Sequence, residues 1–163
     1  MPTRAATVDD LPSWMQLAAE VEPLFGPMPD FEARVRRAIE RRAALVITIG
    51  STVAGAALLS RPNQPHHIHW LAVRSSQRRR GVGHALLAAI VDRWPTEPIE
   101  VVTFTADTAG GAPARRLYES HGFSCVGASD PAPDGNPRDL YVLRRDSTYR
   151  NAATGCFLVV NGE

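Results

Sequence analysis

The stretch that decides the fold runs from Leu71 to His84 and reads LAVRSSQRRRGVGH. Its apolar start is typical of the end of a buried strand, and glycines stand at positions 81 and 83 where a helical pattern begins. A strand that enters such a turn and then a helix exposes unpaired N–H groups at the positive end of the helix dipole. This arrangement suits a phosphate or pyrophosphate group, which the glycines allow to approach the backbone closely.

The composition limits how a phosphate can be held. The chain of 163 residues has 18 basic side chains, and all of them are arginine. The absence of lysine from the sequence excludes Walker-type phosphate loops, protein kinases and pyridoxal enzymes, because each of these needs a lysine. Main-chain amides and guanidinium groups must therefore do the holding.

The bulk numbers describe one soluble globular domain, with 44% hydrophobic and 21% charged residues and a net charge of +1. The near-neutral balance argues against a nucleic-acid partner, although arginines cluster at 34–42 and 78–80. No stretch approaches 18 uninterrupted apolar residues, so no membrane span is expected. Cys125 and Cys156 show no metal-ligand spacing, and we expect no metal and a cytoplasmic location.

Outward from residues 71–84, the pattern predicts the element order β-α-α-β-β-β-α-β-α-β-β. The fold class is therefore α/β (α+β), with a mixed sheet flanked by helices. An aspartate N-cap is expected to begin the first helix, and prolines at 23, 27 and 29 are expected to end it. Expected strands are 4–8, 44–49, 52–60, 66–73, 99–105, 123–128 and 139–144, and the later expected helices are 30–42, 81–94 and 112–121. Residues 1–145 are predicted to form a single domain, and the tail at 146–163 is open between an extra strand, a partner-binding segment and a remnant.

Two motifs at their mutual spacing resemble those of the GCN5-related N-acetyltransferase (GNAT) family. Arg78-x-x-Gly81-x-Gly83 is similar to the family's Arg/Gln-x-x-Gly-x-Gly/Ala signature. The segment ARRLYESHGF at 114–123 resembles its Ala-x-x-Leu-Tyr-x-x-x-Gly-Phe segment. The resemblance covers about residues 3–145 and implies a GNAT-like acyl-CoA N-acyltransferase fold, with acetyl-CoA as cosubstrate.

The same resemblance implies which residues bind acetyl-CoA. Backbone groups of the 71–73 strand are expected to pair with the pantetheine arm, which lies where this strand splays from the strand at 99–105. Amides from Arg79 through His84 are expected to cradle the pyrophosphate. The implied set is Leu71, Ala72, Val73, Arg78, Arg79, Arg80, Gly81, Val82, Gly83 and His84. This sequence departs from the family's pattern at Gly111, where many members have an asparagine. A side-chain contact to the cofactor is therefore expected to be missing at this position.

Tyr118 is the candidate acid for the departing thiolate. Its position matches the family's tyrosine near the cofactor sulfur, and a phenol of reference pKa ~10 can give a proton to a thiolate. The structural alternative is a core aromatic, since Ala114, Leu117, Tyr118 and His121 share one helical face.

His67 is the candidate general base. It lies eleven residues before Arg78, a spacing at which some family members place a glutamate base, and it projects to the same side of its strand as His69. Alternatively, His66, His67 and His69 pack around Trp70. Rival bases are Asp107 and Glu100, and some members of the family bind the neutral amine without a base.

The predicted function is transfer of the acetyl group to a primary amine of a small molecule, by direct attack in a ternary complex. The alternatives are a protein N-acetyltransferase, which a groove at the acceptor side would favour, and a non-catalytic acyl-CoA binding domain. Acidic residues flank the expected acceptor site and could attract a cationic amine, although such loops are usually just solvated: Glu20, Glu22, Asp30, Glu32, Asp130, Asp134 and Asp139. The family often forms dimers, so a homodimer is compatible with the resemblance.

Overall fold

The computed structural model describes residues 1–145, so the predictions for the tail at 146–163 lie outside the described residues. The predicted element order is confirmed, with short 3-10 turns at Val8–Asp10 and Ser75–Gln77 added to it. The strands are β1 (Arg4–Ala5), β2 (Ala44–Ile49), β3 (Thr52–Leu59), β4 (His67–Val73), β5 (Ile99–Phe104), β6 (Ser124–Ser129) and β7 (Arg138–Leu143), and the helices are α1 (Leu11–Phe25), α2 (Phe31–Glu40), α3 (Val82–Arg93) and α4 (Ala112–Ser120). No helix in the described part of the chain is long and apolar enough to cross a membrane.

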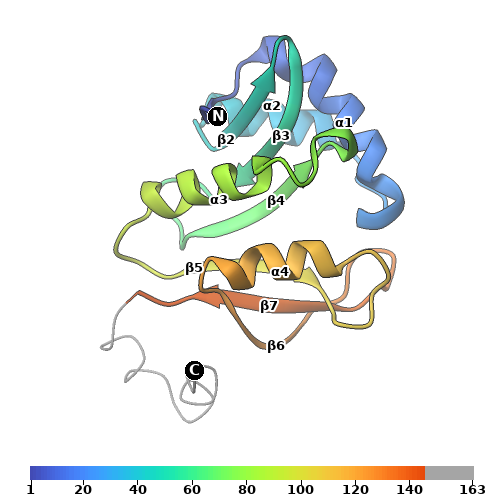
Figure 1. The fold of residues 1–163 in the computed structure, drawn as a ribbon, viewed down its shortest axis with the longest axis vertical. Helices are drawn as coiled ribbons and strands as arrows, with labels where there is room; N and C mark the ends of the chain where they lie inside the picture. Colours follow the sequence, from blue (N-terminus) through green and yellow to red (C-terminus); the bar gives the residue numbers. More distant parts are fainter. Residues whose placement is uncertain (146–163) are drawn as a thin grey trace.

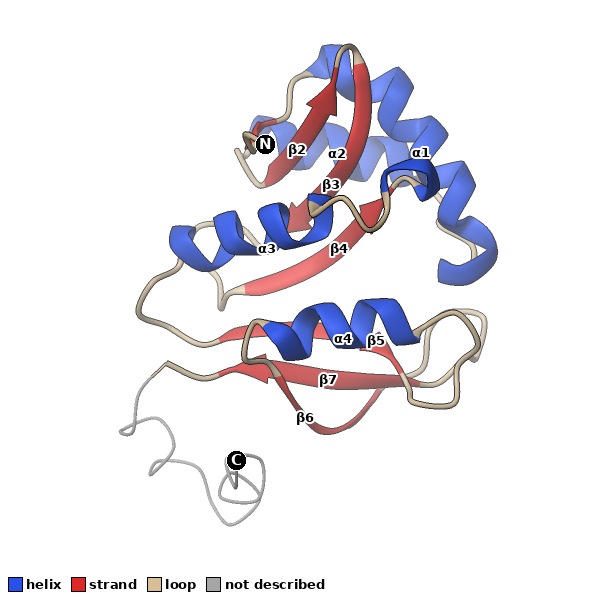
Figure 2. Ribbon diagram, in the orientation of Figure 1, coloured by secondary structure: helices blue, strands red, loops and turns tan. Residues whose placement is uncertain are grey.

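The strands form one mixed sheet with helices on both faces (Figures 1 and 2). Its strand order is β1-β2-β3-β4-β5-β7-β6, and the β4–β5 pair is its parallel step. On one face, Trp14 of α1 and Val35 of α2 are fully buried in a core with Trp70. On the other, Leu86 of α3 packs in a second core that includes Tyr118 of α4. Apolar side chains on both faces of the central strands explain why those strands read as nearly continuous apolar runs.

Glycine at position 55 in β3 lets α3 pack closely against the sheet. A Cβ atom there would lie 2.6 Å from Cγ1 of Val82 and 3.0 Å from Cδ1 of Leu86. Because side-chain atoms do not approach so closely, any larger residue would push α3 outward. The close contact therefore sets the height of the α3 N-terminus above the end of β4.

The start and the end of α1 differ from prediction. Pro23 lies inside the helix, so the prediction that the helix ends there is wrong. Proline removes a single hydrogen bond to Ala19, and only the last turn follows before Gly26, whose φ of 88° ends the helix.

The Asp10 carboxylate does not cap α1, although Asp10 occupies the N-cap position. Instead it accepts hydrogen bonds from Arg4 at 2.9 and 2.8 Å and from the Thr7 amide at 2.8 Å. Burial disfavours the charged form of Asp10, but the hydrogen bonds from Arg4 and Thr7 outweigh it and hold its pKa below the ordinary value. The aspartate therefore ties β1 to the turn before α1.

Candidate active site

The sheet opens between β4 and β5. The two strands pair only at His67 with Glu100 and at Ile68 with Val101, and they diverge from there toward the C-terminal end of β4 (Figure 1). On its other side, β4 stays paired with β3 as far as Val73. The backbone of β4 beyond Ile68 therefore faces β5 without a strand partner, and the splay expected for the pantetheine arm is confirmed.

A β-bulge in β4 shifts its side chains between the two faces. Leu58 of β3 is opposite Trp70 and Leu59 is opposite Ile68, so His69 is the extra residue. Consequently Trp70 belongs to the core under α1 and α2, whereas Ile68, two residues earlier, belongs to the core under α3 and α4. The bulge directs His69 toward the open space at the mouth of the sheet.

The turn before α3 has the geometry of an anion cradle. Arg79 and Gly81 adopt left-handed conformations, with φ of 63° and 84°. The six consecutive amides from Arg79 to His84 donate no hydrogen bond within residues 1–145. The side chains of Arg78, Arg79 and Arg80 are exposed around them. Free N–H groups at a helix N-terminus match the donor set that a pyrophosphate requires.

The two glycines of this turn serve different purposes. Gly81 has nothing within 4 Å of an added Cβ, and its positive φ is what favours glycine there. At Gly83, an added Cβ would lie 3.1 Å from Cδ2 of Leu117. Glycine at position 83 therefore brings α3 close to α4, a role that differs from the expected close approach to phosphate.

A cleft of about 410 Å³ follows the opening of the sheet. Its lining comes from the end of α1, the α1–α2 loop, α2, β4, β5, α4, the loop before β7 and the start of β7. It includes Phe25, Met28, Arg34, His69, Trp70, Leu71, Val101, Phe104, Tyr118, Asp130 and Arg138. Of the residues predicted to bind the pantetheine arm, Leu71 lines this cleft. The walls are mostly apolar, which suits an apolar ligand arm with a few polar groups at fixed places.

Tyr118 lines the cleft from α4 while packing into the core. It is 4% exposed and lies 5.6 Å, centroid to centroid, from the ring of Phe123. Its hydroxyl has no hydrogen-bond partner among the described residues. Burial raises the pKa of Tyr118 above its ordinary value, so the hydroxyl keeps its proton at neutral pH. The core role and a role in the cleft are thus compatible for this residue.

The histidines of β4 separate into two groups. The rings of His67 and His69 lie 4.7 Å apart, which confirms that they share one side of the strand. His69 lines the cleft, whereas His67 does not and has its Nδ1 atom 3.8 Å from Oε1 of Glu100. His66 stacks on Trp94 at a centroid distance of 4.3 Å and not on Trp70, which was the alternative role for this histidine.

Both histidines of this pair favour the neutral imidazole. Burial lowers the pKa of His67. Burial, followed by the nearby charges of His67 and Arg34, lowers the pKa of His69 to about 4. Both rings are therefore able to accept a proton at neutral pH.

The rival bases lie outside the cleft lining. Glu100 faces His67 from β5. Asp107 is exposed, and a hydrogen bond from Thr105 at 2.6 Å lowers its pKa below the ordinary aspartate value. His69 also has a lowered pKa, so the feature that sets these two carboxylates apart from it is their position outside the cleft lining.

The charge around the cleft is not predominantly acidic. Of the acidic residues expected to flank the acceptor site, Asp130 lines the cleft. Arg34 and Arg138 line it as well, and Arg138 is 9% exposed, with its guanidinium carbon 4.8 Å from the centroid of Phe104. The sequence singled out Arg34 as part of the arginine cluster at 34–42, but it did not indicate that Arg34 or Arg138 lines the cleft, because that depends on how distant segments pack.

Comparison with known proteins agrees with this geometry. A family model described as the acetyltransferase (GNAT) family matches residues 10–123. A GNAT acetyltransferase from Bacillus cereus has a similar fold, with a TM-score of 0.72, 17% identity, and coverage of 89% of this chain and 97% of that one. Ard1 from Thermoplasma volcanium matches with a TM-score of 0.74 and 19% identity, covering 90% of this chain and 98% of that one. A protein from Salmonella typhimurium, solved with its cofactor acetyl-CoA, matches with a TM-score of 0.68 and 16% identity, covering 90% of this chain and 94% of that one. None of the curated protein sequences compared with this chain matches it.

Proposed function

The chain belongs to the acetyltransferase (GNAT) family, and on this basis we propose that it transfers the acetyl group of acetyl-CoA to a primary amine of a small molecule. One observation carries the proposal: the free amides of residues 79–84 stand at the same end of the sheet as the unpartnered edge of β4. A pyrophosphate bound by the amides of residues 79–84, with the extended pantetheine arm along the free edge of β4, would bring the thioester to the cleft that Tyr118 lines.

The reaction joins the amine nitrogen to the acetyl carbon and breaks the bond between that carbon and sulfur. Acetyl-CoA supplies an activated acyl group, and no covalent bond to the enzyme is needed. The amine must attack in its neutral form, and its surplus proton passes to a base once the new bond forms. The leaving sulfur takes a proton from the Tyr118 hydroxyl, and the resulting phenolate regains one from solvent.

Cofactor binding and turnover test the proposal in sequence. Acetyl-CoA at a hundred times its Kd should stabilise the fold by about 2.7 kcal/mol, which raises Tm by roughly 5–10 °C for a chain of this size. Thiol release is then followed over a panel of small amines and N-terminal peptides, with mass spectrometry of the products. Stabilisation without thiol release from any amine would instead support the non-catalytic binding domain.

The base is proposed to lie in the His67–His69 pair, with His69 the member that faces the cleft. A base must be neutral to act, and the pKa of each ring is lowered, so its contribution should persist below pH 6.5 and vanish as pH falls through its lowered pKa. Because its lowered pKa makes His69 a weaker proton acceptor than the ordinary imidazole, we expect His69→Ala to lower kcat/KM only about tenfold at pH 7. The ratio of wild type to variant should shrink toward acid pH.

The amine's own ionisation cancels in that ratio, so the ratio isolates the histidine. His67→Ala is profiled in the same way, and an unaltered acidic limb would dismiss His67 as the base. His66→Ala is the matched control, because that ring stacks on Trp94 away from the cleft and should leave the profile unchanged.

A further inference from the structure

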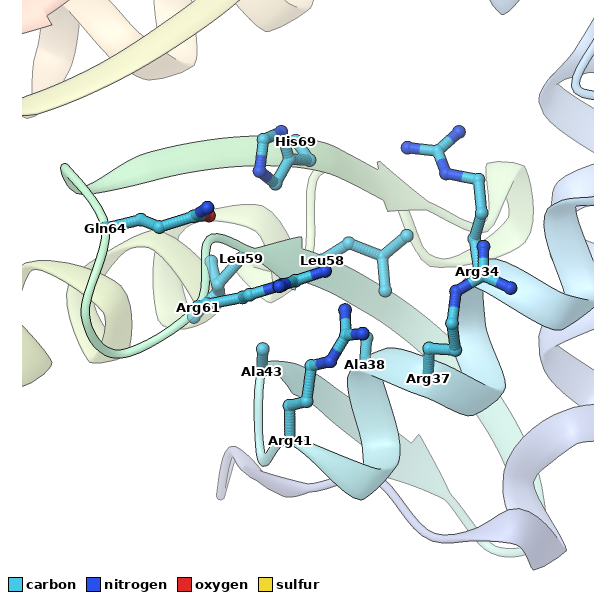
Figure 3. Close-up of a pocket in the computed structure, with 10 residues that line it drawn as sticks. All are labelled: Arg34, Arg37, Ala38, Arg41, Ala43, Leu58, Leu59, Arg61, Gln64 and His69. Carbon is cyan, nitrogen blue, oxygen red and sulfur yellow. The ribbon is translucent and has the colours of Figure 1, made fainter.

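A second concave site, the arginine pocket, adjoins the cleft on the α2 side of the sheet. Arg34 and Arg37 from α2 line it, together with Arg41 directly after α2 and Arg61 from the turn between β3 and β4 (Figure 3). The pocket has a volume of about 380 Å³. Figure 3 shows α2 along one side, the turn on the other and His69 of β4 between them, above a floor that includes Leu58.

The arginine pocket carries uncompensated positive charge. Among the residues that the structure describes, no acidic side chain lines it. None of its four guanidinium groups forms an ion pair or a hydrogen bond within residues 1–145. By contrast, Arg36 on the outer side of the same helix pairs with Glu32 at 3.1 Å. Charges of one sign around an apolar floor focus the local field and attract an anion.

Guanidinium chemistry narrows the kind of anion. Each planar fork binds two oxygens of a carboxylate or a phosphate, so four forks can satisfy a group with several oxygens and two negative charges. A single carboxylate would occupy one or two of them and leave the others repelling one another. The pocket therefore suits a phosphate monoester or two adjacent carboxylates.

The arginine pocket and the cleft are neighbours. Arg34 and His69 line both of them. A small molecule in the cleft can thus place one end among the arginines and the other beside the imidazole of His69.

Resting on the proposed acetyltransferase function, we infer that the arginine pocket binds a doubly charged oxyanion group of the acceptor, whose amine lies in the cleft. The acceptor is then a small amine that bears a phosphate or two carboxylates. This is the opposite charge preference from that expected from the acidic residues that flank the site.

A titration with inorganic phosphate tests the pocket without any need for turnover. Backbone amide NMR shifts report the two anion sites separately, because α2 and the turn at 61–64 are distinct from the loop at 79–84. We expect phosphate to shift the α2 amides in the wild type, and the double variant Arg37→Ala/Arg41→Ala to bind there at least about tenfold more weakly. Arg36→Ala removes one positive charge from the same helix outside the pocket and should keep the shifts. Shifts confined to the 79–84 loop would overturn the inference.

Turnover with matched amines tests whether the anion belongs to the acceptor. The probes are ethanolamine, O-phosphoethanolamine and aspartate, each at saturating acetyl-CoA. We expect kcat/KM to favour a doubly charged amine over ethanolamine, and this preference to fall at least about tenfold in Arg37→Ala/Arg41→Ala but not in Arg36→Ala. The anionic amine with the higher kcat/KM shows whether the acceptor carries a phosphate or two carboxylates.

The two proposals fail differently. Equal kcat/KM for all three amines, or a preference that survives in the double variant, would overturn the anionic acceptor while leaving acetyl transfer intact. No thiol release with any amine would refute acetyl transfer, whereas phosphate shifts in α2 would still support an oxyanion site.

Discussion

We expect Tyr118→Phe to lower kcat by roughly two to three orders of magnitude, the contribution of a well-placed general acid. The variant should fold normally, because phenylalanine fills the same space against Phe123 and the lost hydroxyl has no partner among the described residues. The KM for acetyl-CoA should change little. Steady-state kinetics of thiol release, together with Tm, make the measurement.

The proposed role of Tyr118 as the acid is compatible with its raised pKa. The surroundings that raise the pKa of Tyr118 disfavour any negative charge at this place in the cleft. A thiolate formed beside it suffers the same loss of solvation, so its own proton affinity rises too. The two effects offset each other, and the proton remains on Tyr118 until the sulfur departs.

Tyr141→Phe is the matched control for this variant. Tyr141 is also 4% exposed and belongs to the same core as Tyr118, but it does not line the cleft. Its substitution should leave kcat close to that of the wild type. A Tyr118→Phe enzyme with unchanged turnover would remove Tyr118 from the mechanism and leave it as a core aromatic.

Gly111→Asn should destabilise the fold strongly, even though asparagine is common at this position in the family. An added Cβ would lie 2.5 Å from Cβ of Phe104 and 3.3 Å from the Thr108 carbonyl oxygen. The Phe104 Cβ is attached to the backbone of β5 and cannot swing aside. We expect a loss of about 2–3 kcal/mol and a fall in Tm of roughly 5–10 °C.

Gly50→Asn controls for the loss of glycine itself. Gly50 has a φ of 62°, which asparagine tolerates, and nothing lies within 4 Å of its added Cβ. Its Tm should therefore stay close to the wild-type value. If the Tm of Gly111→Asn equalled that of Gly50→Asn, crowding by Phe104 would not be the reason for glycine at position 111.

Much of the fold was predictable because its signals are local. Apolar periodicity placed every helix and strand to within a few residues, and the turn at Gly50 and the glycine at the end of α4 have the conformations that such turns need. Pro23 was misread because the packing of the last turn of α1, a tertiary effect, outweighed a local preference.

The position of the histidines was not predictable in the same way. A bulge depends on how β4 pairs with β3, and the residues of β4 alone do not reveal it. The alternation rule correctly placed His67 and His69 on one side, but it could not show that His69 is the one that reaches the cleft. The same holds for the arginine pocket, whose fourth member, Arg61, comes from a different element.

By itself, the sequence determined the family and the order of the elements, and it led to the proposal that backbone amides and arginines hold phosphate. These follow from contiguous motifs and from a chain without lysine, and contiguous residues keep their spacing however the chain folds. The tertiary structure alone decided which imidazole lines the cleft, why no asparagine fits at 111, and where four unpaired guanidinium groups meet. Each of these depends on distances between segments far apart in the chain, which only packing sets.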